Sequence, residues 1–254
     1  MQVVSVSTSV LGKVRTNNED NLFVNGTILP QNHEDLSRFI CSEQDDTKMN
    51  LMAVFDGVGG AYYGEEASYE GAREMQRAFL MPGAGNGSTE KFFLNLCDTM
   101  NQKICQRQEE NMASMGSTVS ALLFQKGEAT ICNLGDSPIF SVRDGQICRI
   151  HEEHTNRRFL QNHKIHRKPE LTQCLGISEE ELTICPYIHR HKVQNQDWYL
   201  ICSDGLTDMV SDQEILTIIQ SKLKHEEKVK ELVNQALEKG GRDNITVVLI
   251  NVRE

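Results

Sequence analysis

Acidic residues stand where apolar, strand-like segments of this chain run into turns, and this placement limits how the chain can fold. Five acids occupy such positions: Glu19, Asp20, Asp56, Asp204 and Asp243. A carboxylate that is buried alone beside an apolar strand carries a large free-energy cost. The repeated placement therefore predicts that the acids converge on positive charge. Divalent cations with oxygen ligands, Mg2+ or Mn2+, are the simplest candidates, because no set of soft ligands competes with the carboxylates.

The charge and hydropathy of the chain exclude several classes of protein. Its 254 residues carry 36 acids against 26 lysines and arginines, a formal net charge of −10, which argues against nucleic acid as a partner. No apolar run approaches the roughly 18 residues that cross a bilayer. Residues 1–7 lack the basic and apolar regions of a signal peptide. We therefore expect a cytoplasmic protein that binds neither nucleic acid nor membranes.

Cysteine and histidine do not form a recognisable metal or disulfide pattern. The eight cysteines include no C-x-x-C pair, and Cys132 and Cys202 lie inside apolar runs, where a free thiol behaves as a small hydrophobe. Six of the eight histidines fall within residues 151–196, but their spacing matches no zinc motif. We expect reduced cysteines and neutral surface histidines.

Hydrophobic periodicity predicts a chain rich in both strands and helices. Strands are expected at residues 3–10, 21–24, 51–55, 117–124, 129–134, 138–142, 146–150, 197–203 and 244–252, and helices at 64–80, 89–111, 211–222 and 225–239. The four strands between residues 117 and 150 are joined by tight turns, which predicts an antiparallel meander. Residues 151–196 are polar and look like an irregular surface or inserted segment. Strands in hairpins and helices in pairs predict antiparallel sheets covered by helices, not a βαβ nucleotide fold.

Six short motifs follow one another between residues 15 and 246. They are Arg15-x-x-Asn-Glu-Asp, Asp56-Gly-x-Gly-Gly, Gly116-Ser-Thr, Gly135-Asp-Ser, Ser203-Asp-Gly and Asp243-Asn-Ile-Thr. One such motif means little, since Ser-Asp-Gly is an ordinary turn sequence. Six in register over nearly the whole chain leave little room for chance. With these motifs the chain resembles the metal-dependent protein phosphatases of the protein phosphatase 2C family, bacterial type.

The resemblance implies a fold and an activity. The fold would be α+β, a four-layer α-β-β-α sandwich of two antiparallel sheets flanked by helix pairs. One catalytic domain would span residues 1–254, with a short flap-like segment at about 151–185. The activity would be hydrolysis of phosphoserine and phosphothreonine in proteins by a metal-activated water. The substrates would be targets of a cognate serine/threonine kinase, and we expect a monomer.

The resemblance also assigns metal ligands for two Mn2+ or Mg2+ ions per chain. Asp56 would bridge both ions. Asp204 and Asp243 would complete the coordination of one ion, and Glu19 with the backbone carbonyl of Gly57 would serve the other. Two ions about 3.5–4 Å apart can acidify a bridging water and stabilise the charge of the transition state. Such a site needs no covalent phospho-enzyme, and the chain contains no C-x5-R motif of the cysteine phosphatases.

Three further residues would support the reaction. Arg15 would bind the substrate phosphate, because a guanidinium recognises phosphate oxygens in a planar, bidentate manner. Asp20 would hold metal-bound water, and Asn244 would shape the turn after Asp243. The resemblance thus makes Arg15, Asp20 and Asp56 the catalytic residues. Asp136 in Gly-Asp-Ser is ambiguous, and we favour a hydrogen-bonding role over metal ligation.

Several positions depart from the family pattern. Val58 stands where some members carry a histidine that can protonate the leaving group. Asn111 lies nearest to an aspartate that helps many bacterial members hold a third metal. An amide is a much poorer ligand for a hard cation, so we do not expect a third ion unless Glu110 substitutes. Pro138 replaces a usual arginine. The flap-like segment is shorter than usual, which should alter turnover.

Two alternatives share this fold. The first is a catalytically weak regulatory or binding member, which the presence of all five acids disfavours. The second is a phosphatase for one dedicated regulator or a small phosphorylated metabolite, which Arg15 and Glu19 disfavour. Activity on phosphopeptides against sugar phosphates would separate the second from a general protein phosphatase.

Overall fold

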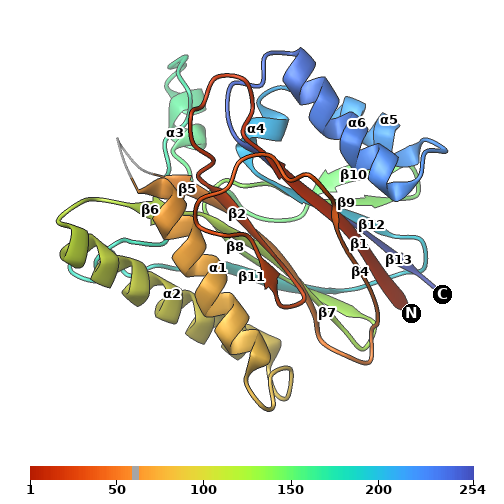
Figure 1. The fold of residues 1–254 in the computed structure, drawn as a ribbon, viewed down its shortest axis with the longest axis horizontal. Coiled ribbons are helices and arrows are strands. Elements are labelled where there is room, and N and C mark those ends of the chain that lie inside the picture. Colours follow the sequence, from red (N-terminus) through yellow and green to blue (C-terminus); the bar gives the residue numbers. More distant parts are fainter. Residues whose placement is uncertain (59–62) are drawn as a thin grey trace.

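The computed structural model describes residues 1–58 and 63–254, which form two antiparallel β-sheets between two helical layers (Figure 1). The strands are β1 (Gln2–Val10), β2 (Asp20–Val24), β3 (Thr27–Ile28), β4 (Ile40–Asp45), β5 (Asn50–Val58), β6 (Gly116–Ser117), β7 (Val119–Gln125), β8 (Glu128–Leu134), β9 (Ile139–Arg143), β10 (Gln146–Arg149), β11 (Tyr187–Lys192), β12 (Trp198–Cys202) and β13 (Ile245–Arg253). The helices are α1 (Gly64–Leu80), α2 (Thr89–Asn111), α3 (Arg157–Asn162), α4 (Asp204–Thr207), α5 (Asp212–Gln220) and α6 (His225–Glu238).

Each sheet contains strands from both halves of the chain. One sheet has the order β10-β9-β12-β13-β1-β4, and the other has the order β11-β8-β7-β5-β2-β3, with β6 paired to β5. Strand β1 pairs with β13 over its full length, so the two ends of the described chain lie side by side (Figure 1). The expected antiparallel sheets covered by helices are confirmed.

Three apolar layers hold the sandwich together. Side chains of α1 and α2, such as Met75 and Phe93, pack on the outer face of the β5 sheet. Side chains of α5 and α6, such as Ile219 and Leu232, cover the outer face of the β13 sheet. Between the sheets lies a third cluster that includes Tyr199, which stacks edge-on against a phenylalanine of β7. Both faces of the central strands are therefore buried, which explains their nearly continuous apolar sequences.

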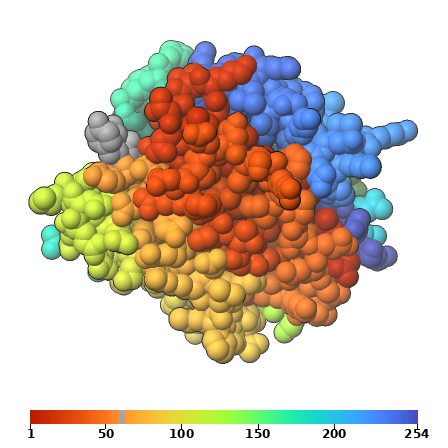
Figure 2. Space-filling view, viewed as in Figure 1, coloured from red at the N-terminus to blue at the C-terminus, as the bar shows by residue number. Residues whose placement is uncertain are grey.

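Figure 2 shows the face on which the N-terminal segment, in red and orange, lies between the α1–α2 layer and the α5–α6 layer.

The predicted meander between residues 117 and 150 is wrong in one respect. Strands β7 and β8 form a hairpin in one sheet, whereas β9 and β10 form a hairpin in the other. The chain crosses between the sheets at residues 135–138. Gly135 permits the crossing, because its φ is +124° and a Cβ there would lie 2.6 Å from Cγ2 of Thr118. Tight-turn spacing reveals hairpins but does not say which sheet each hairpin joins.

Residues 151–196 are not irregular throughout, as the sequence suggested. They contain the short helix α3 and the strand β11, which pairs with β8 and forms the edge of its sheet. The edge strand β4 was also not predicted. Both strands are polar and partly exposed, so neither carries the apolar run that predicts a buried strand.

Candidate active site

Six of the eight predicted site residues line one cleft of about 330 Å3, to which the end of β5 and the start of α4 contribute. They are Arg15, Glu19, Asp56, Gly57, Asp204 and Asp243. The other two, Asp20 and Asn244, are buried behind the cleft wall. The structure therefore brings together residues separated by more than 220 positions in the sequence.

The backbone of β5 delivers Asp56 and Gly57 to the cleft. These residues lie inside the strand, which runs on to Val58, and not in a turn as the Asp-Gly sequence suggested. Asp56 pairs with Asp20 of β2, and Gly57 pairs with a serine of β6. A Cβ on Gly57 would lie 2.3 Å from the carbonyl oxygen of Gly64 and 2.4 Å from that of Glu19. Glycine is therefore required here to let three backbone segments meet.

The other two acids come from the opposite sheet. Asp204 is the first residue of α4, two residues after the end of β12, and Asp243 lies two residues before β13. The start of α4 touches the residues before β13 at Gly205, where a Cβ would lie 2.0 Å from the carbonyl oxygen of Asn244. This close approach fixes Asp204 beside Asp243.

Asn244 ties the loop that carries Arg15 and Glu19 to the start of β13. Its Oδ1 accepts a hydrogen bond from the backbone N–H of Glu19 at 2.8 Å. Its Nδ2 donates to the carbonyl oxygens of Leu11 at 2.9 Å and Asn17 at 3.0 Å. With only 3% of its surface exposed, Asn244 acts as a structural brace for the cleft.

Burial and mutual repulsion raise the pKa of several acids at the cleft. Burial raises the pKa of Asp20 to about 7, although its carboxylate accepts a 2.7 Å hydrogen bond from the hydroxyl of Ser203. The pKa of Asp56 lies well above its ordinary value because of burial and then repulsion from Asp20 and Asp204. Burial also raises the pKa of Asp136 to about 6. The raised pKa values mean that the side chains and backbone around the cleft do not fully stabilise the negative charge of its carboxylates.

Two side-chain cations contact the acids. Arg15 Nη2 lies 2.8 Å from Asp243 Oδ2, and its Nη1 lies 3.8 Å from Glu19 Oε2. Lys168 Nζ lies 2.8 Å from Asp204 Oδ2 and also binds a neighbouring aspartate. Sequence reasoning missed Lys168, because a lysine before a proline in a polar segment gives no sign of its destination.

No three carboxylate, imidazole or thiolate groups within residues 1–58 and 63–254 are arranged closely enough to hold a metal ion together. Arg15 and Lys168 each pair with a carboxylate oxygen of the cleft. The set of donors is nevertheless all oxygen, which suits hard divalent cations.

A family model described as "Protein phosphatase 2C" matches residues 33–249 of the chain. The chain belongs to the protein phosphatase 2C family. It is 28% identical to protein phosphatase PhpP of Streptococcus pneumoniae, over 99% of this chain and 98% of the relative. It is also 28% identical to serine/threonine phosphatase stp of Listeria welshimeri, over 94% and 92% of the two chains.

Solved structures of the protein phosphatase 2C type resemble this fold over its whole length. The serine/threonine phosphatase PstP/Ppp of Mycobacterium tuberculosis is 25% identical, with a TM-score of 0.81 and complete coverage of both chains. The catalytic domain of PstP in complex with two manganese ions is 28% identical, with a TM-score of 0.78 and complete coverage of both chains. The predicted four-layer sandwich is confirmed.

The departures from the family pattern occupy different parts of the structure. Val58 is 39% exposed at the edge of the cleft. Asn111 donates a 2.8 Å hydrogen bond to Glu66, and Glu110 pairs with Arg107 at 2.7 Å, so neither side chain lines the cleft. Asp136 does line the cleft. Gly59 and Gly60 of the Asp-Gly-x-Gly-Gly motif lie outside the described residues.

Several histidines of residues 151–196 have structural partners in the described part of the chain. His154 Nδ1 accepts a hydrogen bond from the backbone N–H of Gly135 at 3.2 Å, and His191 bonds the hydroxyl of Tyr199 at 2.9 Å. His151, His189 and His191 line a hollow of about 710 Å3 between the edge strands β10 and β11. Among the described residues that line this hollow, Asp144 is the single acid.

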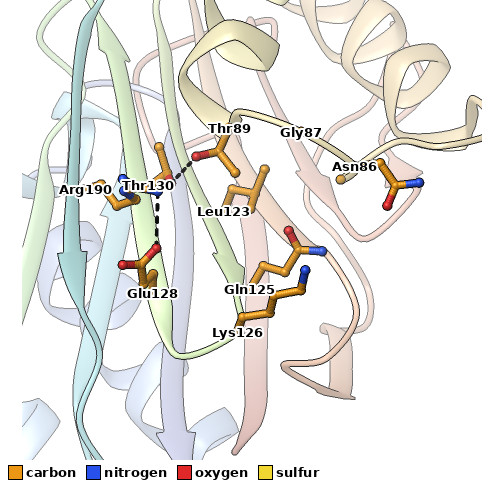
Figure 3. Close-up of a pocket in the computed structure, with 10 residues that line it drawn as sticks. Asn86, Gly87, Thr89, Leu123, Gln125, Lys126, Glu128, Thr130 and Arg190 are labelled. Atoms are coloured by element: carbon orange, nitrogen blue, oxygen red, sulfur yellow. Dashed lines mark hydrogen bonds and ion pairs between the residues drawn. The ribbon is translucent and has the colours of Figure 1, made fainter.

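Another hollow, of about 270 Å3, lies between the residues before α2 and the hairpin β7–β8 (Figure 3). Two pairs of its polar groups bond each other. The hydroxyls of Thr89 and Thr130 are 2.8 Å apart, and Arg190 pairs with Glu128 at 3.3 Å. None of the predicted site residues lines it, so the acidic cleft is the better candidate for the chemistry.

Proposed function

We propose that this chain removes phosphate from serine and threonine residues of proteins, using two Mn2+ or Mg2+ ions. The observation that carries the proposal is the convergence of Glu19, Asp56, Asp204 and Asp243 on one cleft beside Arg15. Membership of the protein phosphatase 2C family and the names of the relatives as serine/threonine phosphatases support it.

The residues at the cleft have the chemistry that two divalent cations require. Asp56 would contact both ions, Asp204 and Asp243 would hold one, and Glu19 with the Gly57 carbonyl would hold the other. The raised pKa of Asp56 supports this assignment, because bound cations would offset the repulsion among the buried acids. When bound, the ions would acidify the attacking water and neutralise charge on the phosphate. A third ion is not part of the proposal, because Asn111 and Glu110 are bonded elsewhere.

The remaining residues bind and orient the substrate. Arg15 is 46% exposed in its side chain, so its guanidinium can reach the oxygens of an incoming phosphate while staying beside Asp243. Asp20 is held by the Ser203 hydroxyl and would orient water at the ions. Val58 offers no proton, so water or another group must protonate the leaving serine or threonine oxygen.

The proposal extends to the setting of the enzyme. Its substrates would be phosphorylated proteins, including targets of a cognate serine/threonine kinase, and it would act as a monomeric, single-domain enzyme in the cytoplasm. Among the described residues, no helix has the length and apolarity to span a bilayer. The net charge of −10 favours protein over nucleic-acid partners.

The test is hydrolysis of a phosphothreonine peptide by chelator-treated protein to which Mn2+ is added back. Activity should return with Mn2+ and should fall at least about a hundredfold in Asp204→Asn, because one charged ligand is lost. Asp98→Asn, at an exposed position on α2, is the matched control and should keep full activity. Sugar phosphates should be poor substrates.

Two results would contradict the proposal. Hydrolysis that survives both chelation and Asp204→Asn would remove the metal site from the mechanism. A folded protein that binds Mn2+ but releases no phosphate would favour the regulatory alternative.

A further inference from the structure

Lys168 reaches into the acidic cleft from the flap-like segment of about residues 151–185. Its Nζ lies 2.8 Å from Asp204 Oδ2 and 2.9 Å from Asp208 Oδ2. Asp204 is the proposed metal ligand that begins α4, and Asp208 directly follows α4. A single ammonium group therefore joins the flap-like segment to the helix that presents the ligand.

The two ends of the loop that carries Lys168, residues 156–170, are bonded to each other. Asn156 and Glu170 exchange backbone and side-chain hydrogen bonds, including Glu170 N–H to Asn156 Oδ1 at 2.9 Å. Thr155 and Leu171 form an isolated β-bridge. These contacts hold the two ends of residues 156–170 together, so Lys168 extends from a closed loop and not from a loose strand.

The ammonium and a divalent cation compete for the same carboxylate. A cation bound by Asp204 would share the carboxylate that Lys168 now contacts, and two positive charges at one carboxylate repel each other strongly in a partly buried cleft. The side chain of Asp204 is only 20% exposed, so water screens this repulsion incompletely. Lys168 is 59% exposed, so it can swing into solvent when it is displaced.

We propose that Lys168 is a tethered competitor of the metal: its ammonium neutralises Asp204 in the metal-free protein and lowers the affinity of the cleft for divalent cations. The inference rests on the proposed function, since it concerns the same metal site. Loading of metal would release Lys168 and with it the link between the flap-like segment and α4. The flap-like segment would therefore be held against α4 in the metal-free protein and freed from it when metal binds.

The test measures Mn2+ binding directly, by isothermal titration calorimetry on chelator-treated protein without substrate. Lys168→Gln should bind Mn2+ about three- to tenfold more tightly than the wild type, the size expected for removal of two partly exposed ion pairs. Lys164→Gln removes the same charge from an exposed position in the same segment and should leave the affinity unchanged. Lys168→Arg keeps the charge and should keep an affinity near that of the wild type.

The outcomes separate this inference from the proposed function. A wild-type chain that takes up no Mn2+ would overturn both. A wild type that binds Mn2+ and hydrolyses the phosphopeptide, while Lys168→Gln binds Mn2+ no more tightly, would overturn the inference alone. An increase in KM for the phosphopeptide with unchanged Mn2+ affinity would also overturn it, because Lys168 would then contact substrate and not compete with metal.

Discussion

Replacing Asn244 with alanine tests whether the brace behind the cleft positions the residues that face it. The substitution removes three hydrogen bonds, one from the backbone of Glu19 and two to the carbonyl oxygens of Leu11 and Asn17. A hydrogen bond contributes about 1 kcal/mol to stability, so the three together predict a loss of about 3 kcal/mol in the free energy of unfolding. For a chain of this size, such a loss corresponds to a fall in Tm of roughly 6–12 °C.

Activity should fall further than stability alone would explain. The lost hydrogen bond to Glu19 frees the loop of residues 11–19, which carries both Arg15 and a proposed metal ligand. Misplacement of such groups by about 1 Å can cost on the order of a hundredfold in rate. Phosphopeptide hydrolysis should therefore be impaired well below the new Tm, where the variant is still folded.

Urea unfolding followed by circular dichroism and a phosphopeptide assay at saturating Mn2+ give the two measurements. Asn234→Ala, at an exposed position on α6, is the control and should change neither. Asn244→Asp keeps the acceptor for the Glu19 N–H but turns a buried carboxylate oxygen towards the carbonyl oxygens of Leu11 and Asn17, so it should be at least as destabilising as Asn244→Ala. The reasoning is refuted if Asn244→Ala unfolds within about 0.5 kcal/mol of the wild type and keeps its activity, because the loop must then be held by other contacts.

Two further substitutions test buried polar groups outside the cleft. His151 has a pKa lowered by burial to about 4, so its neutral form contributes stability that is fully present above pH 6.5 and is lost as the pH falls towards 4. Between pH 7 and 5 the wild type should lose about 2 kcal/mol more stability than His151→Gln, measured by urea unfolding at each pH, and equal losses would contradict this. Lys228 is 3% exposed and donates to the carbonyl oxygens of Ile218 at 3.4 Å and Ile219 at 2.6 Å, near the end of α5. Lys228→Met should lower the free energy of unfolding, measured in urea, by about 2–3 kcal/mol. Lys230→Met, on the exposed face of α6, should leave it almost unchanged. Equal effects would show that the hydrogen bonds from Lys228 to the end of α5 do not stabilise the protein.

Elements with strong apolar periodicity could be predicted from the sequence. The ranges expected for α1 and α2 agree with the structure at both ends, and the central strands differ by only a few residues. These segments bury one or both faces, so their apolar residues repeat with the period of the element. The edge strands β4 and β11 could not be predicted, because an edge strand obtains its stability from one neighbour and tolerates polar side chains.

The arrangement of the site was predictable only in part. The motifs correctly predicted that one cleft contains Arg15, Glu19, Asp56, Asp204 and Asp243. Their metal-binding roles remain predictions. Side-chain partners were out of reach, because the contact of Lys168 with Asp204 depends on where a polar loop folds back in three dimensions. The partner of Asn111 was equally hidden, since it comes from another helix.

The position of β13 has a consequence for the order in which the chain can fold during synthesis. Strand β13 lies between β12 and β1 in its sheet. Neither β12 nor β1 can pair with it until residue 253 has been made. Pairing over almost the full length of the chain is slow compared with local contacts. A nascent chain can form the helical hairpin α1–α2 and the hairpin β7–β8 early, but the acids of the cleft come together only after β13 has been made. Phosphatase activity should thus be absent from any nascent chain whose β13 has not yet emerged from the ribosome.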